Sequence, residues 1–153
     1  MLQQVLDAAM EVIRYNEYAR PVLLKVSPDL EQSQLDQIIH LALINGIDGI
    51  VATNTTRSRD NLVTPEKTIS SIGEGGLSGA PLFEKSKATV KYIHEKSGGL
   101  LPIIAAGGIM TPAQAAEMLD AGADLVEVYT GFIYNGPKFA KRIVKHLKKR
   151  SKK

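Results

Sequence analysis

The chain alternates between two patterns of apolar residues, one with the period of a helix and one typical of buried strands. The first helical segment, residues 2–14, has an apolar face formed by Val5, Ala9, Val12 and Ile13. Four short apolar runs predict strands at residues 21–26, 48–53, 101–106 and 124–130. Helical patterns separate these runs, and the last one covers residues 136–149. The predicted order is therefore one helix followed by four strand–helix units.

Capping signals mark the helices between the predicted strands. The apolar side chains that the second helix turns inward are Leu35, Ile38, Ile39, Ala42 and Leu43. Asn45–Gly46 predicts its end, and a further helix is expected over residues 83–96. The next helix begins at Thr111 as N-cap, with Pro112 in its first turn and Gln114 three residues after the cap.

Apolar strands separated by helices are typical of a parallel sheet that helices cover. Connections in such sheets are right-handed, which leaves two architectures, an open doubly wound sheet or part of a (β/α) barrel. Short polar or glycine-rich stretches follow every strand, at residues 27–29, 53–56, 107–108 and 130–131. In both architectures ligands bind at this carboxyl edge of the sheet. The sequence therefore predicts that these stretches form the functional site.

Several residues at this edge are candidates for binding a ligand or cofactor. Lys25 interrupts an apolar strand, where an unpaired ammonium group is costly. It either reaches solvent from an edge strand or points at an anionic ligand or cofactor, and we favour the second. The Gly107–Gly108 pair lets the backbone approach a ligand closely, and a helix start after it favours a phosphate. Thr130–Gly131 ends the next strand, and consecutive barrel loops of this kind commonly share one phosphate.

The connection from Thr55 to about Pro81 is far longer than the ~2–6 residues usual for a strand-to-helix turn. It contains Thr, Ser, Asn, Arg and Gly residues and ends in "GGLSGAPL". Long loops of this kind are commonly lids, binding loops or disordered segments. We expect an ordered loop that covers a site.

Composition narrows the function classes. The 153 residues suit one domain, and 44% hydrophobic with 23% charged residues is ordinary for a globular protein. Aromatic residues make up only 5%, without Trp, which argues against nucleic acid as a partner. The absence of Cys excludes disulfides and thiolate ligands, and the three His residues lack ligand spacing, so no metal site is expected. No apolar run has the length of a membrane span.

The net charge of +3 is concentrated at the C-terminal end, because residues 138–153 hold nine lysines and arginines and no acid. One interpretation is an amphipathic helix whose basic end favours the helix dipole, followed by a solvated tail at about residues 148–153. The alternative is attraction to an anionic membrane or nucleic acid.

Five segments give the chain a family resemblance: "LLKVSPDL", "GIVATNTTRSR", "GGLSGAPL", "IIAAGGI" and "VEVYTGFIYNGP". In this order and with similar spacing, they resemble the class 2, quinone-dependent dihydroorotate dehydrogenases over nearly the whole chain. The resemblance is specific, because flavin barrels in general share the Gly-Gly phosphate loop but not "ATNTT" followed by "GLSGAPL".

The resemblance implies an α/β fold of the (β/α)8 TIM-barrel family, with residues 1–153 as a half-barrel that covers about strands five to eight. It implies FMN as cofactor and oxidation of dihydroorotate to orotate in pyrimidine biosynthesis, with electrons passing to a quinone. It also implies that the full enzyme is peripheral on the cytoplasmic side of the inner membrane, whereas this chain alone is soluble.

The same resemblance assigns roles to residues. Lys25 matches a lysine beside the pyrimidine edge of the flavin, where its charge stabilises the reduced, anionic ring. Asn54 and Thr55 match residues that hydrogen-bond the orotate ring. The positions that match cofactor-binding residues are Lys25, Thr53, Ser78, Gly79, Gly107, Gly108, Tyr129 and Thr130.

This chain departs from the family in that it matches only the second half of the barrel. The family's catalytic base is a serine in the first half of the barrel, so no catalytic residue is expected here and the chain alone is expected to be inactive. The alternative hypothesis is a non-catalytic half-barrel that binds FMN or phosphate. Such a half-barrel is expected to associate with itself or with the missing half.

Overall fold

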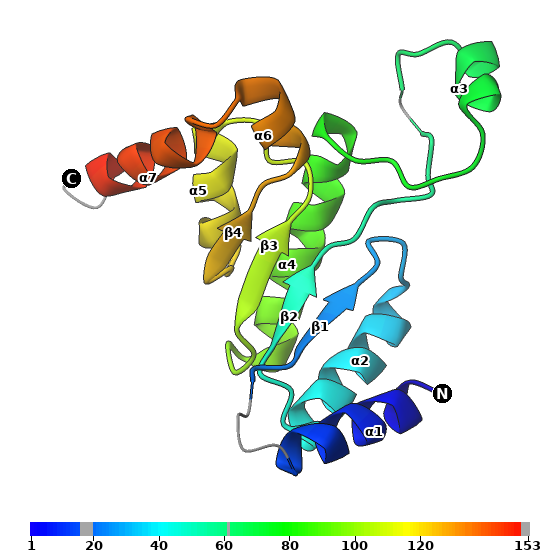
Figure 1. Cartoon of the computed structure of the whole chain (residues 1–153), viewed down its shortest axis with the longest axis vertical. Coiled ribbons are helices and arrows are strands. Elements are labelled where there is room, and N and C mark those ends of the chain that lie inside the picture. The colour runs from blue at the N-terminus through cyan, green and yellow to red at the C-terminus, as the bar shows by residue number, and fades with distance from the viewer. Residues whose placement is uncertain (16–19, 61, 151–153) are drawn as a thin grey trace.

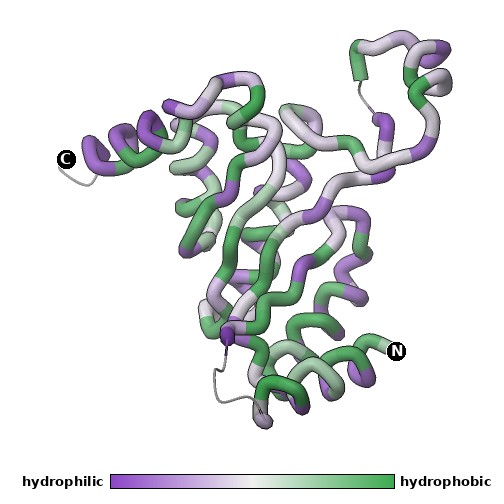
Figure 2. The backbone as a smooth tube through the Cα atoms, viewed as in Figure 1, coloured by the Kyte–Doolittle hydropathy of each residue, from purple (hydrophilic) through white to green (hydrophobic). Residues whose placement is uncertain are grey.

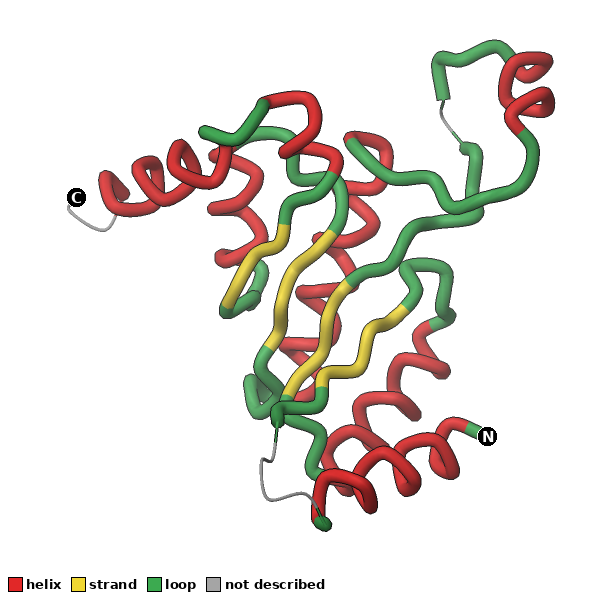
Figure 3. Tube along the Cα trace, in the orientation of Figure 1, coloured by secondary structure: helices red, strands yellow, loops and turns green. Residues whose placement is uncertain are grey.

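The computed structural model describes residues 1–15, 20–60 and 62–150. Its helices are α1 (Leu2–Arg14), α2 (Gln32–Asn45), α3 (Glu66–Ile72), α4 (Phe83–Ser97), α5 (Pro112–Asp120), α6 (Thr130–Asn135) and α7 (Phe139–Arg150), with a 3-10 turn η1 (Ala80–Leu82) before α4. Its strands are β1 (Leu23–Val26), β2 (Gly49–Ala52), β3 (Ile103–Ala106) and β4 (Leu125–Glu127). The predicted order of one helix and four strand–helix units is confirmed (Figures 1 and 3).

The four strands form one parallel sheet in the order β1-β2-β3-β4. Lys25 pairs in register with Val51, which pairs with Ile104, and Ile104 pairs with Leu125. Because all strands run the same way, their carboxyl ends lie together at one edge, as Figure 1 shows. Each strand is shorter than the apolar run that predicted it, and the excess residues form the turns on either side.

Helices cover one face of the sheet. Val26, Ile50 and Ile103 point into a core that they share with side chains of α2, α4 and α5. On the opposite face, 41% of Leu23 and 61% of Leu125 is exposed. A doubly wound sheet carries helices on both faces, whereas a barrel carries them outside only. In the described part of the chain the arrangement is therefore that of a barrel segment.

The prediction of which apolar face of α1 is buried is wrong. Leu6 is buried, whereas Val5 is 60% and Val12 is 66% exposed. The helix carries two apolar stripes, and the side chain of Gln3 donates to the Asn45 side chain at 2.9 Å, which turns the stripe of Leu6 toward α2. Along α2 the prediction is largely confirmed, but Leu43 is exposed.

Other local predictions are confirmed. Gly46 ends α2 in the left-handed conformation, with φ of 67°. At α5, the Thr111 hydroxyl accepts from the Gln114 N–H and the Gln114 side chain accepts from the Thr111 N–H, which is the predicted capping box.

In α7, Phe139 and Ile143 are buried and basic residues occupy the last turn, so the amphipathic helix is confirmed. Figure 2 shows hydrophilic and hydrophobic residues alternating along α7. Residues 151–153 of the predicted tail lie outside the described residues.

The long connection after β2 contains structure that the sequence did not predict. Helix α3 lies within it and projects away from the sheet (Figure 1). Thr56 and Leu77 form an antiparallel bridge at its neck, and the Arg59 guanidinium donates to the Gly75 carbonyl at 2.6 Å. Within the described residues, the two ends of the connection therefore lie at the carboxyl edge of the sheet, and α3 itself does not line the pocket there.

Candidate functional site

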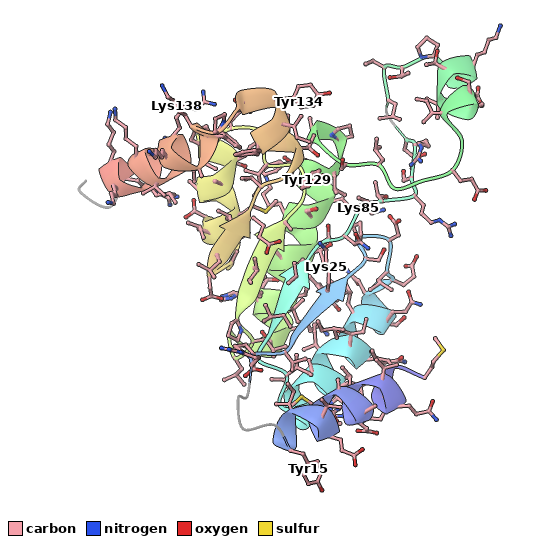
Figure 4. All side chains as sticks on the ribbon, in the orientation of Figure 1. Tyr15, Lys25, Lys85, Tyr129, Tyr134 and Lys138 are labelled. Atoms are coloured by element: carbon pink, nitrogen blue, oxygen red, sulfur yellow. The ribbon has the colours of Figure 1, made fainter. Side chains whose placement is uncertain are left out.

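A pocket of about 450 Å³ opens at the carboxyl edge of the sheet. Its lining includes all ten residues that the family resemblance matched to cofactor or substrate contacts: Lys25, Thr53, Asn54, Thr55, Ser78, Gly79, Gly107, Gly108, Tyr129 and Thr130. Figure 4 labels both Lys25, on the edge strand β1, and Tyr129, which follows the edge strand β4. The volume lies within the range of ~300–1,000 Å³ typical of small-molecule sites.

The loop before α4 is tied to the end of β4 across the pocket. The Thr130 hydroxyl donates to Ser78 Oγ at 3.0 Å. Gly79 has a φ of 86°, and a Cβ there would lie 3.1 Å from the Thr130 methyl group. A side chain at Gly79 would therefore be strained and crowded. This contact brings two hydroxyl groups and the Gly79 backbone together at one end of the pocket.

The paired glycines after β3 are required by packing as well as by any ligand. Gly108 has a φ of 74°, and a Cβ there would lie 2.3 Å from the backbone of Phe83 at the start of α4. A Cβ on Gly107 would lie 2.4 Å from Ser86 Oγ. The sequence analysis explained these glycines by the close approach of a ligand. The structure adds that their backbone packs directly against α4.

Thr53 is buried beneath the pocket and uses its polar atoms inside the protein. Its N–H donates to the Ala106 carbonyl at 2.5 Å, and its hydroxyl donates to the Asn54 carbonyl at 2.9 Å. The peptide bond that joins it to Ala52 is cis. The Asn54 N–H donates to the Val26 carbonyl at 2.8 Å, while the side chains of Asn54 and Thr55 are exposed to the pocket.

Two charged side chains line the pocket from the two edge strands. Lys25 on β1 is exposed and has no hydrogen bond or ion pair with any other described residue. Lys25 lies on an edge strand of the described sheet and also lines the pocket, so its position is compatible with both interpretations. Glu127 on β4 lines the same pocket and was not predicted. The signal that identified Lys25, a charge within an apolar strand, also applies to Glu127.

Asp29 links the loops after β1 and β2 to α4. The sequence placed it in the polar stretch after the first strand but gave it no role of its own. It accepts hydrogen bonds from the Thr56 hydroxyl at 2.6 Å, the Arg57 N–H at 2.7 Å and the Lys85 ammonium at 2.5 Å. Desolvation raises the pKa of Asp29, but the bonds from Lys85, Thr56 and Arg57 outweigh it and lower the pKa to about 2. Asp29 is therefore a charged anchor that fixes the turn next to Asn54 and Thr55.

A second hollow of about 450 Å³ shares Asn54 and Thr55 with the first. Its remaining lining comes from Ser27, Asp29, Arg57 and the loop at 74–76. A Cβ on Gly76 would overlap the Thr55 side chain, so glycine is required there. Asn54 and Thr55 therefore lie between two spaces, from which they can reach a ligand on either side.

The helix start nearest the pocket is not the one that the sequence indicated. Thr111, the cap of α5, does not line the pocket, because its polar groups are used in the capping box. Thr130, the first residue of α6, lines it instead. The sequence missed this helix, since "TGFIYN" has neither the length nor the period of a helix.

Comparisons with known proteins agree on one family. A sequence model of the family "Dihydroorotate dehydrogenase" matches residues 1–150. A protein of Rhodococcus opacus named dihydroorotate dehydrogenase (quinone) is 50% identical over 127 residues, covering 83% of this chain and 36% of that protein. A protein of the same name from Rhodococcus erythropolis is 43% identical over 149 residues, covering 97% of this chain and 40% of that protein.

Solved structures give the same result. DHODH of Eimeria tenella in complex with ferulenol superposes with a TM-score of 0.85 and 34% identity, covering 95% of this chain and 43% of that one. The ligand-free form gives a TM-score of 0.87 and 33% identity, covering 95% and 44%. These likenesses confirm the predicted α/β fold of the TIM-barrel family. The chain spans about two fifths of the length of its curated relatives. None of the described helices is long and apolar enough to cross a membrane.

Proposed function

The chain belongs to the dihydroorotate dehydrogenase family, and we propose that it supplies part of a site that oxidises dihydroorotate to orotate with FMN. In this proposal its strands are numbers five to eight of the barrel. The observation that carries the proposal is the pocket at the carboxyl edge, which gathers all ten residues matched to flavin and substrate contacts.

The chemistry of the lining fits a flavin nucleotide. One end offers hydroxyl groups from Ser78 and Thr130 together with the backbone at Gly107 and Gly108, which suits a phosphate. The opposite side offers the ammonium group of Lys25, which has no partner among the described residues. A single ligand with an anionic group at one end and an electron-accepting ring at the other would use both the hydroxyl-rich end and the Lys25 ammonium group.

When bound, FMN accepts the electrons of the substrate, and the residues of this chain orient the reactants and stabilise charge. The Lys25 ammonium stabilises negative charge that develops on the reduced ring. The Asn54 amide and the Thr55 hydroxyl hold the polar edges of the substrate from their position between the two hollows. We assign no proton-abstracting residue to this chain.

In the whole protein we propose that a quinone takes up the electrons and that the enzyme is peripheral on the cytoplasmic side of the inner membrane. The relatives whose names include quinone support the acceptor. The site described above does not depend on this part of the proposal, since it concerns the first half-reaction only.

FMN titration tests the proposal. We expect FMN to bind the chain with saturation, seen as quenching of flavin fluorescence, and Lys25→Ala to lower the midpoint potential of the bound flavin. A fall on the order of 30 mV corresponds to about 1.4 kcal/mol for a two-electron couple. Lys67→Ala is the matched control, because Lys67 lies on α3 and does not line the pocket. Absence of saturable binding, or an equal potential in Lys25→Ala and the parent, would contradict the proposal.

A second candidate function is self-association without catalysis. β1 and β4 each have only one neighbouring strand in the described sheet, and Leu23 and Leu125 on them are exposed. Unpaired edges of this kind pair readily with another chain. A second copy that covers both edges would also bury the open face of the sheet.

A further inference from the structure

We propose that Ser86 is a positioning residue, whose buried hydroxyl fixes the Thr53 hydroxyl at the floor of the pocket and thereby orients Thr53 toward the bound ligand. This inference rests on the proposed function for the identity of that ligand, FMN. Ser86 does not itself line the pocket.

Ser86 is fully buried on α4. Its Oγ lies 2.8 Å from Thr53 Oγ1, and this is the hydrogen bond that the described residues offer its side chain. Burial of a hydroxyl group is unfavourable unless the group is hydrogen-bonded. The contact with Thr53 supplies this hydrogen bond to Ser86.

Either hydroxyl could donate in this bond, but one direction alone gives both protons an acceptor among the described residues. A threonine hydroxyl has one proton, and Thr53 donates it to the Asn54 carbonyl at 2.9 Å. Ser86 is then the donor to Thr53, which accepts. The two bonds together restrict the rotation of the Thr53 side chain about χ1. One acceptor position of Thr53 Oγ1 remains for a group of the ligand.

Ser86 also contacts the second loop of the pocket. A Cβ on Gly107 would lie 2.4 Å from Ser86 Oγ, so the Gly107 backbone rests on the serine side chain. The single hydroxyl of Ser86 therefore lies where the ends of β2 and β3 meet. Removing it leaves Thr53 without its donor and opens space beneath Gly107.

FMN affinity is the first readout. We expect Ser86→Ala to raise the dissociation constant of FMN about tenfold, the usual effect of one lost hydrogen bond. The matched control is Ser97→Ala, since Ser97 is equally buried on α4 but donates only to the His94 carbonyl of its own helix. We expect less than about a twofold change there. Equal affinities in Ser86→Ala and Ser97→Ala would overturn the proposal.

A double-variant cycle separates positioning from general damage to the fold. In a Thr53→Val background there is no hydroxyl to orient, so adding Ser86→Ala should change FMN affinity by less than about twofold. A tenfold loss in that background as well would show that Ser86 acts through packing and not through Thr53.

The third readout needs no FMN. Three-bond couplings of the Thr53 side chain, measured by NMR on the whole chain, report its χ1 rotamer. We expect one rotamer in the parent and in Ser97→Ala, and averaging in Ser86→Ala. One unchanged rotamer in all three proteins would overturn the inference. If the parent itself fails to bind FMN, the proposed function is wrong, and these couplings alone then decide the role of Ser86.

Discussion

Replacing Asp29 with asparagine tests the charged anchor beside the pocket. The variant keeps the size of the side chain and removes its charge, so it weakens the bonds from Lys85, Thr56 and the Arg57 N–H. Charge-assisted hydrogen bonds are the stronger kind. We therefore expect Asp29→Asn to reduce the free energy of unfolding at neutral pH.

The magnitude follows from the lowered pKa of Asp29. A fall from 3.8 to about 2 corresponds to about 2.4 kcal/mol, at ~1.36 kcal/mol for each pH unit. Because 27% of the Asp29 side chain and 44% of the Lys85 side chain is exposed, solvent and salt screen part of this interaction. We expect a loss of about 1 kcal/mol in Asp29→Asn.

The pH dependence has a definite sign. The pKa of Asp29 is lower in the folded state than the ordinary value of 3.8, so the carboxylate stabilises the fold fully above about pH 4. This contribution disappears as the pH falls through about 2. The difference between the parent and Asp29→Asn should therefore be largest near pH 7 and approach zero near pH 2.

Urea unfolding at a series of pH values between 7 and 2 measures this difference. Asp7→Asn is the matched control, because the Asp7 carboxylate lies on α1 and accepts only from the Gln3 side chain at 2.6 Å. That control should change the free energy of unfolding by less than ~0.5 kcal/mol at each pH. A difference for Asp29→Asn that stays constant with pH would refute the reasoning, since it would show that packing and not charge is responsible.

Two further predictions concern packing and association. Gly108→Ala should destabilise the fold by about 3 kcal/mol or more in thermal or urea unfolding, because strain at φ of 74° adds to contact with the Phe83 backbone at 2.3 Å. Gly46→Ala, at φ of 67° with nothing within 4 Å, should cost only about 1 kcal/mol, and equal losses would contradict the role of the contact. Sedimentation at micromolar concentration should show dimers or larger species, and Leu125→Lys should reduce them, because Leu125 is an exposed apolar residue on an edge strand. A monodisperse parent monomer would exclude self-association.

The positions of the pocket residues could be predicted because they follow from local sequence and one topological rule. Most of them lie at or just after a strand, and parallel strands place their carboxyl ends at one edge. Ser78 and Gly79 end the long connection before α4 instead, and only the family resemblance pointed to them. The anchoring roles of Asp29 and Ser86 could not be predicted in this way, because their partners lie up to 56 residues away in sequence. The prediction of the buried face of α1 was wrong for a related reason. The helix carries two apolar stripes, and only the contact with α2 selects which of them is buried.

The contacts that fix the pocket converge on the first turn of α4. Phe83 underlies Gly108 after β3, Lys85 donates to Asp29 after β1, and Ser86 bonds to Thr53 after β2. The residues just before this turn, Ser78 and Gly79, line the pocket themselves. The start of α4 therefore anchors the loops after β1, β2 and β3, while the residues just before it line the pocket. The positions of these loops depend on the position of α4. Because a helix turn is rigid, a displacement of α4 would move the three loops together, so the long connection after β2 serves the site by placing the start of α4.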